Sequence, residues 1–173
     1  MGNFSCSFRY VLASLQKPDN SFTKMAWGLT SSDPAVDANN LRKSIENRAN
    51  SIILQKAAFN WLAVDLRSQH NIQVIYLNKK FTSGTANPLR VFVGVSPFDT
   101  AAAASNPDRR LCGNITASTA PDGVTVSLPC AMVGRYIHLI NKGTPNAAGT
   151  AFTGGIVLFE LDVYIQALRY QGD

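Results

Sequence analysis

Residues 134–140 read GRYIHLI, a glycine and an arginine followed by a run of large side chains. Aromatic and β-branched residues in such a run are typical of a strand. The stretch lies a few residues after Cys130, in a chain that contains three cysteines. A strand that begins with a charged residue beside a cysteine needs a structural reason for both, and the kind of protein depends on that reason.

Other stretches share this pattern, with apolar residues that alternate at a period of two. They cover residues 60–66, 71–77, 88–95, 123–128 and 156–165. The segments between them are rich in Gly, Pro, Asn, Ser and Thr, which are typical of turns and loops. Many short strands without alternating helices predict an all-β fold, an antiparallel jelly-roll sandwich, as one domain over residues 1–173. Loops gather at the two ends of such a sandwich, and function usually lies there.

The stretch 33–55 departs from the period of two. Its apolar residues have helical spacing, and Asn39 or Asn40 would serve as the N-cap: Leu41, Ile45, Ala49, Ile52 and Ile53. The same stretch contains four asparagines and two serines, which also suit a long loop. Both interpretations stay open.

Composition excludes several classes of protein. The chain has 173 residues, enough to bury a core, and a formal net charge of +5. Its basic residues are scattered, whereas a nucleic-acid surface needs a dense basic stripe with interleaved aromatics. The longest apolar runs, 51–59 and 154–165, are too short to cross a bilayer. The first residues are too polar for a cleavable signal peptide, so the protein is cytosolic, has lost a leader or is a piece of a longer chain.

The cysteines bear on the compartment. Cys112 and Cys130 are 18 positions apart and flank a hairpin-like stretch whose second arm is residues 123–128. A bridge between them would stabilise the fold by ~3 kcal/mol, and two reduced, buried cysteines are the alternative. Cys6 has no obvious partner. Two glycosylation sequons, at Asn3 and Asn114, together with a plausible disulfide favour an extracellular or cell-surface setting.

Six stretches then carry a resemblance through their order and spacing: LASLQKPD (12–19), PAVDANN (34–40), NWLAVDL (60–66), SNPDRRLCGNIT (105–116), PCAMVGRYIHL (129–139) and FELDVYI (159–165). Together they resemble the F-type lectins, or fucolectins, within the wider discoidin-like group of galactose-binding domains. The resemblance runs from about Leu12 to Ile165 and implies a discoidin-like jelly roll. It also implies a disulfide between Cys112 and Cys130, beside which Arg135 would pin the beginning of a core strand with hydrogen bonds.

The family's sugar site is not intact in this chain. Its members bind terminal sugars through a histidine and two arginines in loops at one end of the barrel. Where the family has arginine-x-aspartate, this chain has Lys79-Lys80-Phe81. The second arginine has no clear match in 82–88, and the histidine has none in 51–59. Fucose specificity therefore does not carry over.

A remodelled ligand site is one interpretation of the residues that remain, and a solvated hairpin corner is the other. The candidate ligand-binding residues are Lys79, Lys80 and Phe81, with Arg42 and Arg48 from a neighbouring loop. Lysine donors would favour an acidic or sulfated glycan, or a carboxylate on a protein partner. We expect both lysines to be exposed. The binding face would be formed by 41–48, 78–81 and 143–155, with Phe81 either tucked into the core or presented to a partner.

The resemblance also implies a structural calcium ion. The matching residues are Asp37, Asn39 and Glu160, whose oxygens suit that metal. The alternative is that Asp37 merely caps a turn.

No pattern for catalysis is present: the sequence lacks a nucleophile elbow, a P-loop and a dinucleotide fingerprint. His70 and His138 are expected to be structural or solvated. We expect Trp61 to be mostly buried at a sheet edge, and Asp65, on the same face, to be hydrogen-bonded. The sequence predicts an extracellular, lectin-like carbohydrate-binding module of non-standard specificity. The alternative is a protein–protein interaction domain in an adhesive, coat or filament assembly, as a homo-oligomer or part of something larger.

Overall fold

The computed structural model describes residues 8–12, 28–31, 52–55, 59–82, 85–97, 108–149 and 151–168. In these ranges every regular element is a β-strand. The strands are β1 (Phe8–Leu12), β2 (Gly28–Ser31), β3 (Ile52–Gln55), β4 (Phe59–Phe81), β5 (Leu89–Gly94), β6 (Arg109–Ile115), β7 (Thr125–Lys142), β8 (Thr144–Pro145), β9 (Phe152–Thr153) and β10 (Gly155–Leu168). The described residues contain no helix long and apolar enough to span a membrane.

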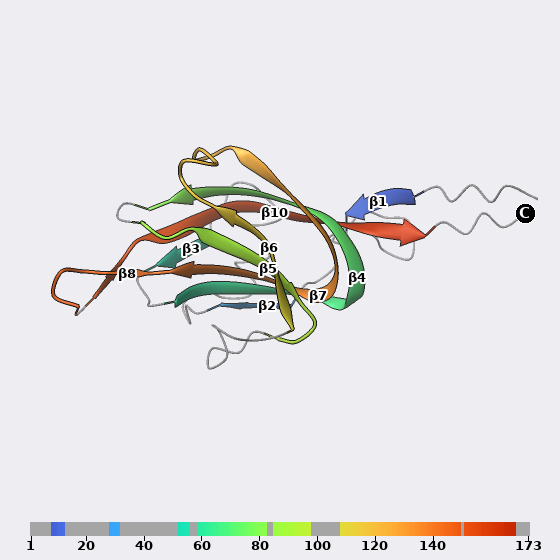
Figure 1. Cartoon of the computed structure of the whole chain (residues 1–173), viewed down its shortest axis with the longest axis horizontal. Coiled ribbons are helices and arrows are strands. Elements are labelled where there is room, and N and C mark those ends of the chain that lie inside the picture. The colour runs from blue at the N-terminus through green and yellow to red at the C-terminus, as the bar shows by residue number, and fades with distance from the viewer. Residues whose placement is uncertain are drawn as a thin grey trace, which may run out of the picture.

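Two long strands build the sandwich, because each takes part in both layers (Figure 1). The first half of β4 pairs with β2 and with the second half of β7, which pairs in turn with β5. The second half of β4 pairs with β10 and with the first half of β7. All these pairings are antiparallel, and β6 continues the first layer beside β5. The expected antiparallel sandwich is thus confirmed.

Both long strands bend at the same place. The register of β4 against β7 shifts between Asp65 and His70 and again between Ile72 and Val74. Arg67, with a φ of 72°, and Ala131, with a φ of 46°, absorb the bends in the left-handed region. We expected separate strands over 60–66 and 71–77, and over 123–128 and 135–140. This expectation is wrong, because each strand continues through the intervening residues with a shift of register instead of ending at a turn.

The core lies between the layers and is formed by inward-facing aliphatic residues of both halves. Leu62 and Val64 in the first layer and Ile75, Leu77 and Leu161 in the second are fully buried. Alternate residues on these strands face the core, which is why the period of two predicted them.

The GRY step of the opening stretch has a separate reason for each of its first two residues. A Cβ at Gly134 would lie 2.3 Å from Val93 Cγ1 and 2.9 Å from the Gly94 carbonyl oxygen, so only glycine permits this approach of β7 to β5. The Arg135 guanidinium donates from Nε to Asp65 Oδ1 at 2.7 Å and from a terminal nitrogen to Asp65 Oδ2 at 2.8 Å. The structural role of Arg135 is confirmed, although β7 runs through this residue rather than beginning there.

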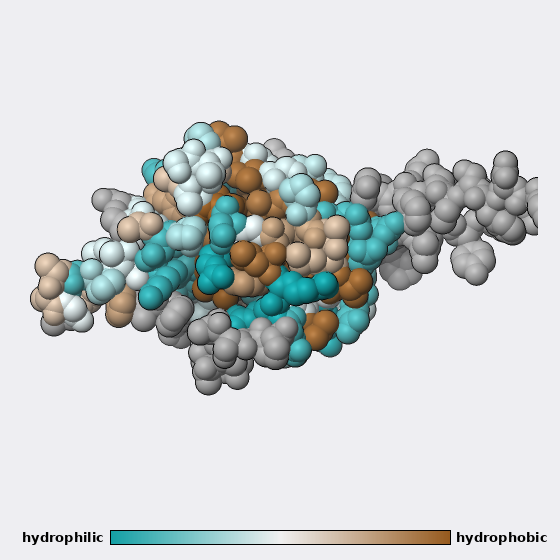
Figure 2. Space-filling model, in the orientation of Figure 1, coloured by the Kyte–Doolittle hydropathy of each residue, from teal (hydrophilic) through white to brown (hydrophobic). Residues whose placement is uncertain are grey.

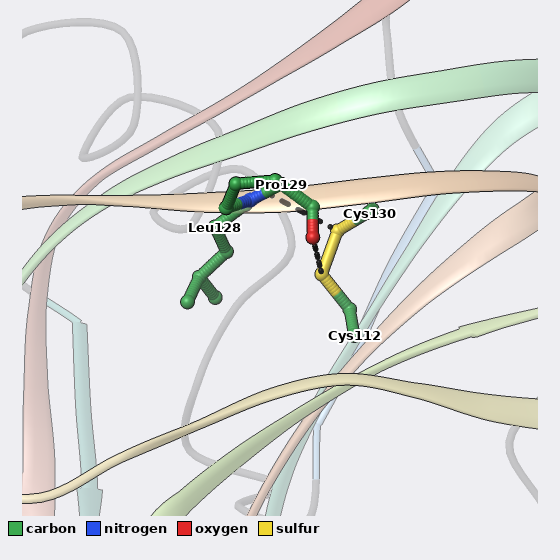
Figure 3. The surroundings of a disulfide bond; sticks show 4 residues. All are labelled: Cys112, Leu128, Pro129 and Cys130. Carbon is green, nitrogen blue, oxygen red and sulfur yellow. Dashed lines mark hydrogen bonds between the residues drawn. A yellow bond between two sulfur atoms is a disulfide. The ribbon is translucent and has the colours of Figure 1, made fainter.

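The expected disulfide between Cys112 and Cys130 is present (Figure 3). It joins β6, in the first layer, to the first half of β7, in the second, where Leu128 and Pro129 precede Cys130. The two cysteines were expected on the arms of a hairpin, and this reason is wrong: β6 pairs with β5, and the described residues show no ladder between β6 and β7. The bond therefore fastens one layer to the other.

Several elements were not predicted. Residues 52–55 form β3, paired with β10, so the helical interpretation of 33–55 is wrong at this end. The rest of that stretch lies outside the described residues. Arg109 and Arg110 begin β6, although they were assigned to a loop. The expected loop 143–155 contains the small hairpin of β8 and β9, which projects at the left of Figure 1.

Candidate functional site

A pocket of about 380 Å³ lies at the end of the sandwich that carries the β8–β9 hairpin. Two loops form its walls, the β4–β5 loop and the β6–β7 loop. Its lining side chains are hydroxyl, amide and apolar groups, and none of them is charged: Phe81, Thr85, Ala86, Asn87, Thr116, Ala117 and Ser118. Hydroxyls and an amide supply hydrogen bonds, while methyl groups and a ring edge supply apolar contact.

The β4–β5 wall is fixed to the beginning of β10. The Thr85 hydroxyl accepts a hydrogen bond from the Gly155 amide at 2.8 Å, and the Thr82 amide donates to the Gly155 carbonyl at 3.0 Å. Gly154 has a φ of 82°, and a Cβ there would lie 2.7 Å from the Thr85 Cα. Thr82 and Thr85 are therefore fixed to the beginning of β10 by hydrogen bonds and close packing.

Asn87 occupies the end of the same wall. Its Nδ2 donates to the Lys142 carbonyl at 2.9 Å, and Asn141 Nδ2 donates to the Asn87 carbonyl at 2.8 Å. The Oδ1 of Asn87 has no hydrogen-bond partner among the described residues, so it is an acceptor that a ligand hydroxyl can use.

The β6–β7 wall is a compact turn of hydroxyl residues. The Thr116 amide donates to Thr119 Oγ1 at 2.9 Å, and the Thr119 amide donates to Thr116 Oγ1 at 3.1 Å. Ser118 Oγ lies 2.8 Å from Thr116 Oγ1, and the exposed Ala117 and Ser118 form the rim. These mutual bonds fix the hydroxyl groups in one arrangement.

Lys79 corrects the expectation that both lysines of the NKKF stretch are exposed. Its side chain is fully buried, and the ammonium donates to the Ala120 carbonyl at 2.6 Å. Asp122 Oδ1 lies 3.3 Å from the same nitrogen. Alternation along β4 places Lys79 on the inward face with Leu77 and Phe81, and this signal identifies the burial when the strand is extended beyond Leu77. The Lys79 charge is thus compensated inside the protein.

Lys80 and Phe81 take opposite sides of the strand. Lys80 is exposed, as expected. Phe81 is tucked into the core, with 9% of the residue exposed, and it lines the pocket. Residues 78–81 and 143–155 do come together at one end, because Ile156 pairs with Phe81. Arg42 and Arg48 lie outside the described residues, as does the rest of 41–48. The contribution of this segment to the binding face therefore stays a prediction.

Asp122 links the Lys79 ammonium to the backbone of Phe81, which lines the pocket. Its Oδ1 accepts from the Phe81 amide at 3.0 Å as well as facing Lys79. The hydrogen bond from the Phe81 amide lowers the pKa of the Asp122 carboxyl below its ordinary value. Burial opposes this effect, and the Lys79 ammonium adds to the lowering. The carboxylate is therefore charged at neutral pH.

The calcium residues are only partly placed. Glu160 is half-buried on β10, paired with Asn78, whereas Asp37 and Asn39 lie outside the described residues. One carboxylate does not form a metal site, and no group of three or more acidic, histidine or cysteine side chains gathers in the part of the chain described above. Calcium stays a prediction.

The remaining expectations concern single side chains. Trp61 is partly buried and pairs with Ile140 of β7, whereas β2 pairs with β4 from Leu62 to Asp65, so its expected place at a sheet edge stays a prediction. Asp65 is hydrogen-bonded by Arg135, as expected. His138 is fully buried, and burial together with nearby Arg109 lowers its pKa to about 4. Asn114 is exposed on β6, whereas Asn3 and Cys6 lie outside the described residues.

Comparisons with known proteins find similar structures but no similar sequences. No family model and no curated protein matches the sequence. A fucolectin from Morone saxatilis (striped bass) serum is similar in structure, with a TM-score of 0.59 at 19% identity over 83% of this chain and 47% of that chain. Chitosan-binding module 1 from a Paenibacillus sp. IK-5 chitosanase/glucanase gives 0.56 at 16% identity, over 89% of this chain and 98% of the module. CpGH89CBM32-6 from Clostridium perfringens gives 0.55 at 14%, over 82% and 95%.

The fold is the antiparallel β-sandwich that this chain shares with the fucolectin and the two binding modules. The resemblance to the F-type lectins is confirmed at the level of the fold, and so is the expected jelly roll. Identities this low establish the fold alone, and a ligand has to be argued from the site.

Proposed function

We propose that this chain is a carbohydrate-binding module that takes a sugar in the pocket between the β4–β5 and β6–β7 loops. The observation that carries the proposal is the lining of the pocket. Ser118 and Asn87 offer hydrogen-bonding groups, and Phe81, Ala86 and Ala117 offer apolar surface. A pyranose presents the same two kinds of surface, with hydroxyls around its rim and C–H groups on its faces.

Structural neighbours support this class of ligand. CpGH89CBM32-4 from Clostridium perfringens, with a TM-score of 0.54 at 16% identity, was solved with GlcNAc-α-1,4-galactose. The CBM32 of AlyQ, with a TM-score of 0.51 at 16% identity, was solved with 4,5-unsaturated mannuronic acid. These ligands belong to those proteins, and for this chain they support sugars as the class to test first.

The charge around the pocket bears on which sugars to test. Lys79 is occupied internally, so Lys80 is the one lysine of the pair that faces solvent. No charged residue occurs in 143–154, and Figure 2 shows the projecting hairpin in the pale colours of intermediate hydropathy. The pocket lining itself is uncharged, so neutral sugars are tested first. Acidic and sulfated glycans in the same experiment test whether Lys80, Arg42 and Arg48 contribute to binding.

A glycan array tests the proposal, read with calcium and with a chelator. We expect binding by the wild-type chain and its loss in Ala86→Trp and Ala117→Trp, because either indole fills the pocket from an exposed position. Ser127→Trp is the matched control, since Ser127 is exposed on the outer side of β7 opposite Tyr76. An array without a bound glycan would reject the proposal and favour the protein–protein interaction domain. Binding that only the chelator abolishes would support the calcium site.

A further inference from the structure

Lys79 presents an unusual arrangement, a lysine that is fully buried at the end of β4. An ammonium group in the interior is costly unless hydrogen bonds and an opposite charge replace its water. This chain supplies both. The Ala120 carbonyl accepts at 2.6 Å, the Asp122 carboxylate lies 3.3 Å away, and the Phe81 ring centroid lies 4.4 Å from the nitrogen. The site is built around the positive charge.

These partners belong to the same segments as the lining of the pocket. Ala120 and Asp122 lie in the β6–β7 loop but do not line the pocket, whereas Phe81 does and is called its floor. The backbone of Lys79 takes part as well, because the Gly123 amide donates to its carbonyl at 2.9 Å. Lys79 itself does not line the pocket. It therefore contacts the β6–β7 loop and the Phe81 ring without forming part of the pocket surface.

The contact is transmitted to the rim through one hydrogen bond. The Ala120 amide donates to the Thr116 carbonyl at 3.1 Å, and Thr116 is the residue from which the hydroxyl turn is built. A shift of Ala120 would therefore move Thr116, and with it Ala117 and Ser118. Asp122 closes the unit by accepting from the Phe81 amide at 3.0 Å.

We infer that Lys79 is a positioning residue of the pocket: its buried ammonium holds the β6–β7 loop against the end of β4 and so sets the distance between wall and floor. The inference rests on the proposed function for its binding readout, but its effect on the loop is independent of any ligand. A residue that acts in this way makes affinity sensitive to its removal while leaving affinity insensitive to salt, because the ammonium is buried and donates to a backbone carbonyl, which salt screens little.

The experiment compares Lys79→Met, which keeps an unbranched side chain one atom shorter and removes its charge, with Arg90→Met, which removes a charge at an exposed position of β5. The probes are L-fucose, D-galactose and N-acetylglucosamine, with D-galacturonate and galactose 6-sulfate as anionic counterparts. Titrations followed by amide NMR report affinity, and hydrogen exchange reports the loop.

For Lys79→Met we expect a loss of about tenfold or more in affinity for the sugar that the wild type binds. We also expect faster exchange at the amides of the 116–124 loop. Arg90→Met should change neither. Asp122→Ala removes part of the same contact at a residue whose side chain is 43% exposed, so it keeps the test open if Lys79→Met does not fold. A smaller change in the same direction is expected for it, and partial rescue by Lys79→Arg.

Three other results would decide against the inference or against the proposed function, or would leave loop exchange as the sole test. Unchanged loop exchange and affinity in folded Lys79→Met, or in Asp122→Ala where Lys79→Met does not fold, would overturn the inference. Tighter binding of the anionic probes that weakens with salt, and is lost in Lys79→Met, would show that Lys79 contacts the ligand, and would overturn the inference while leaving the proposed function standing. If no probe binds, the proposed function fails for these sugars, and loop exchange alone decides the role of Lys79.

Discussion

Arg135 and Asp65 are joined by two hydrogen bonds, at 2.7 and 2.8 Å, across the bend where β4 and β7 pass from one layer to the other. Asp65 Oδ1 also accepts from the Arg67 amide at 2.8 Å, and Arg67 is the residue with a φ of 72°. A single carboxylate thus neutralises the arginine and fixes the strained residue of the bend. The pair specifies the corner on which the two-layer arrangement depends.

Asp65→Asn is expected to destabilise the fold by about 1–3 kcal/mol, because it leaves a partly buried guanidinium without its counter-charge. The estimate stays modest because the Arg135 side chain is 37% exposed and water can replace part of the loss. Urea unfolding followed by tryptophan fluorescence measures it. In a double-mutant cycle with Arg135→Met, the double variant should lose less stability than the sum of the losses in the two single variants. Additive effects would show that the pair is not coupled.

Removing the disulfide should destabilise the protein by roughly 3 kcal/mol, the chain-entropy estimate for a closed loop of this length. The variant is Cys112→Ala with Cys130→Ala, whose partners lie 18 positions apart. Thermal unfolding with and without a reductant provides the measurement, and the double variant should not respond to the reductant. Since the bond fastens β6 to the opposite layer, hydrogen exchange should increase first in β6. Free thiols at both positions in a non-reduced digest would contradict the bond.

The sequence was most informative where alternation was unbroken. Residues 88–95 and 156–165 were predicted as strands and correspond to β5, which is one residue shorter at each end, and to the inside of β10. One face of each strand is buried, and the period of two shows it. The bends were missed, because RSQH at 67–70 and the proline, alanine and glycine of 129–134 are also the residues of turns. Nothing local shows that a strand continues through them.

The candidate site was harder to predict for a different reason. The partners of Lys79 lie about forty positions further along the chain, at Ala120 and Asp122, so no local pattern reveals its environment. The β6–β7 wall was missed because its threonines and serine look like those of any loop. The short run IILQ at 52–55 fits helix and strand alike, and only its pairing with β10 decides.

The burial of His138 is expected to make the fold less stable at mildly acidic pH. Burial, followed by nearby Arg109, lowers its pKa from 6.5 to about 4, so the folded protein holds the imidazole neutral. The unfolded chain binds the proton near pH 6.5 and the folded chain only near pH 4, so acid favours unfolding between these values. This contribution is complete above about pH 6.5 and is lost as the pH falls toward 4, by roughly 3 kcal/mol. Urea unfolding at several pH values should show this slope, and His138→Gln should reduce it. An equal slope in the variant would assign the effect to other groups.

The sequon at Asn114 allows a test of the predicted extracellular setting. It stands on β6, whose described residues pair on one side only, with β5, and its side chain is exposed. A glycan attached there extends into solvent without displacing a packed residue, which is the condition for a tolerated modification. A chain passing through a secretory pathway is therefore expected to carry an N-glycan at Asn114.

Expression in a eukaryotic secretory host, followed by glycosidase treatment and intact-mass measurement, provides the test. Asn114→Gln should remove one glycan, and Thr116→Ser should keep it, because serine also completes the sequon. Asn3→Gln separates the contribution of the second sequon. The Thr116 variants add a second readout, since Thr116 Oγ1 accepts from the Thr119 amide in the pocket wall. Thr116→Ser keeps that hydroxyl and should keep sugar binding, whereas Thr116→Ala should lose both the glycan and much of the binding. A secreted protein with an intact Cys112–Cys130 bond and an unmodified Asn114 would contradict this prediction, because accessibility alone would then be insufficient for modification at β6.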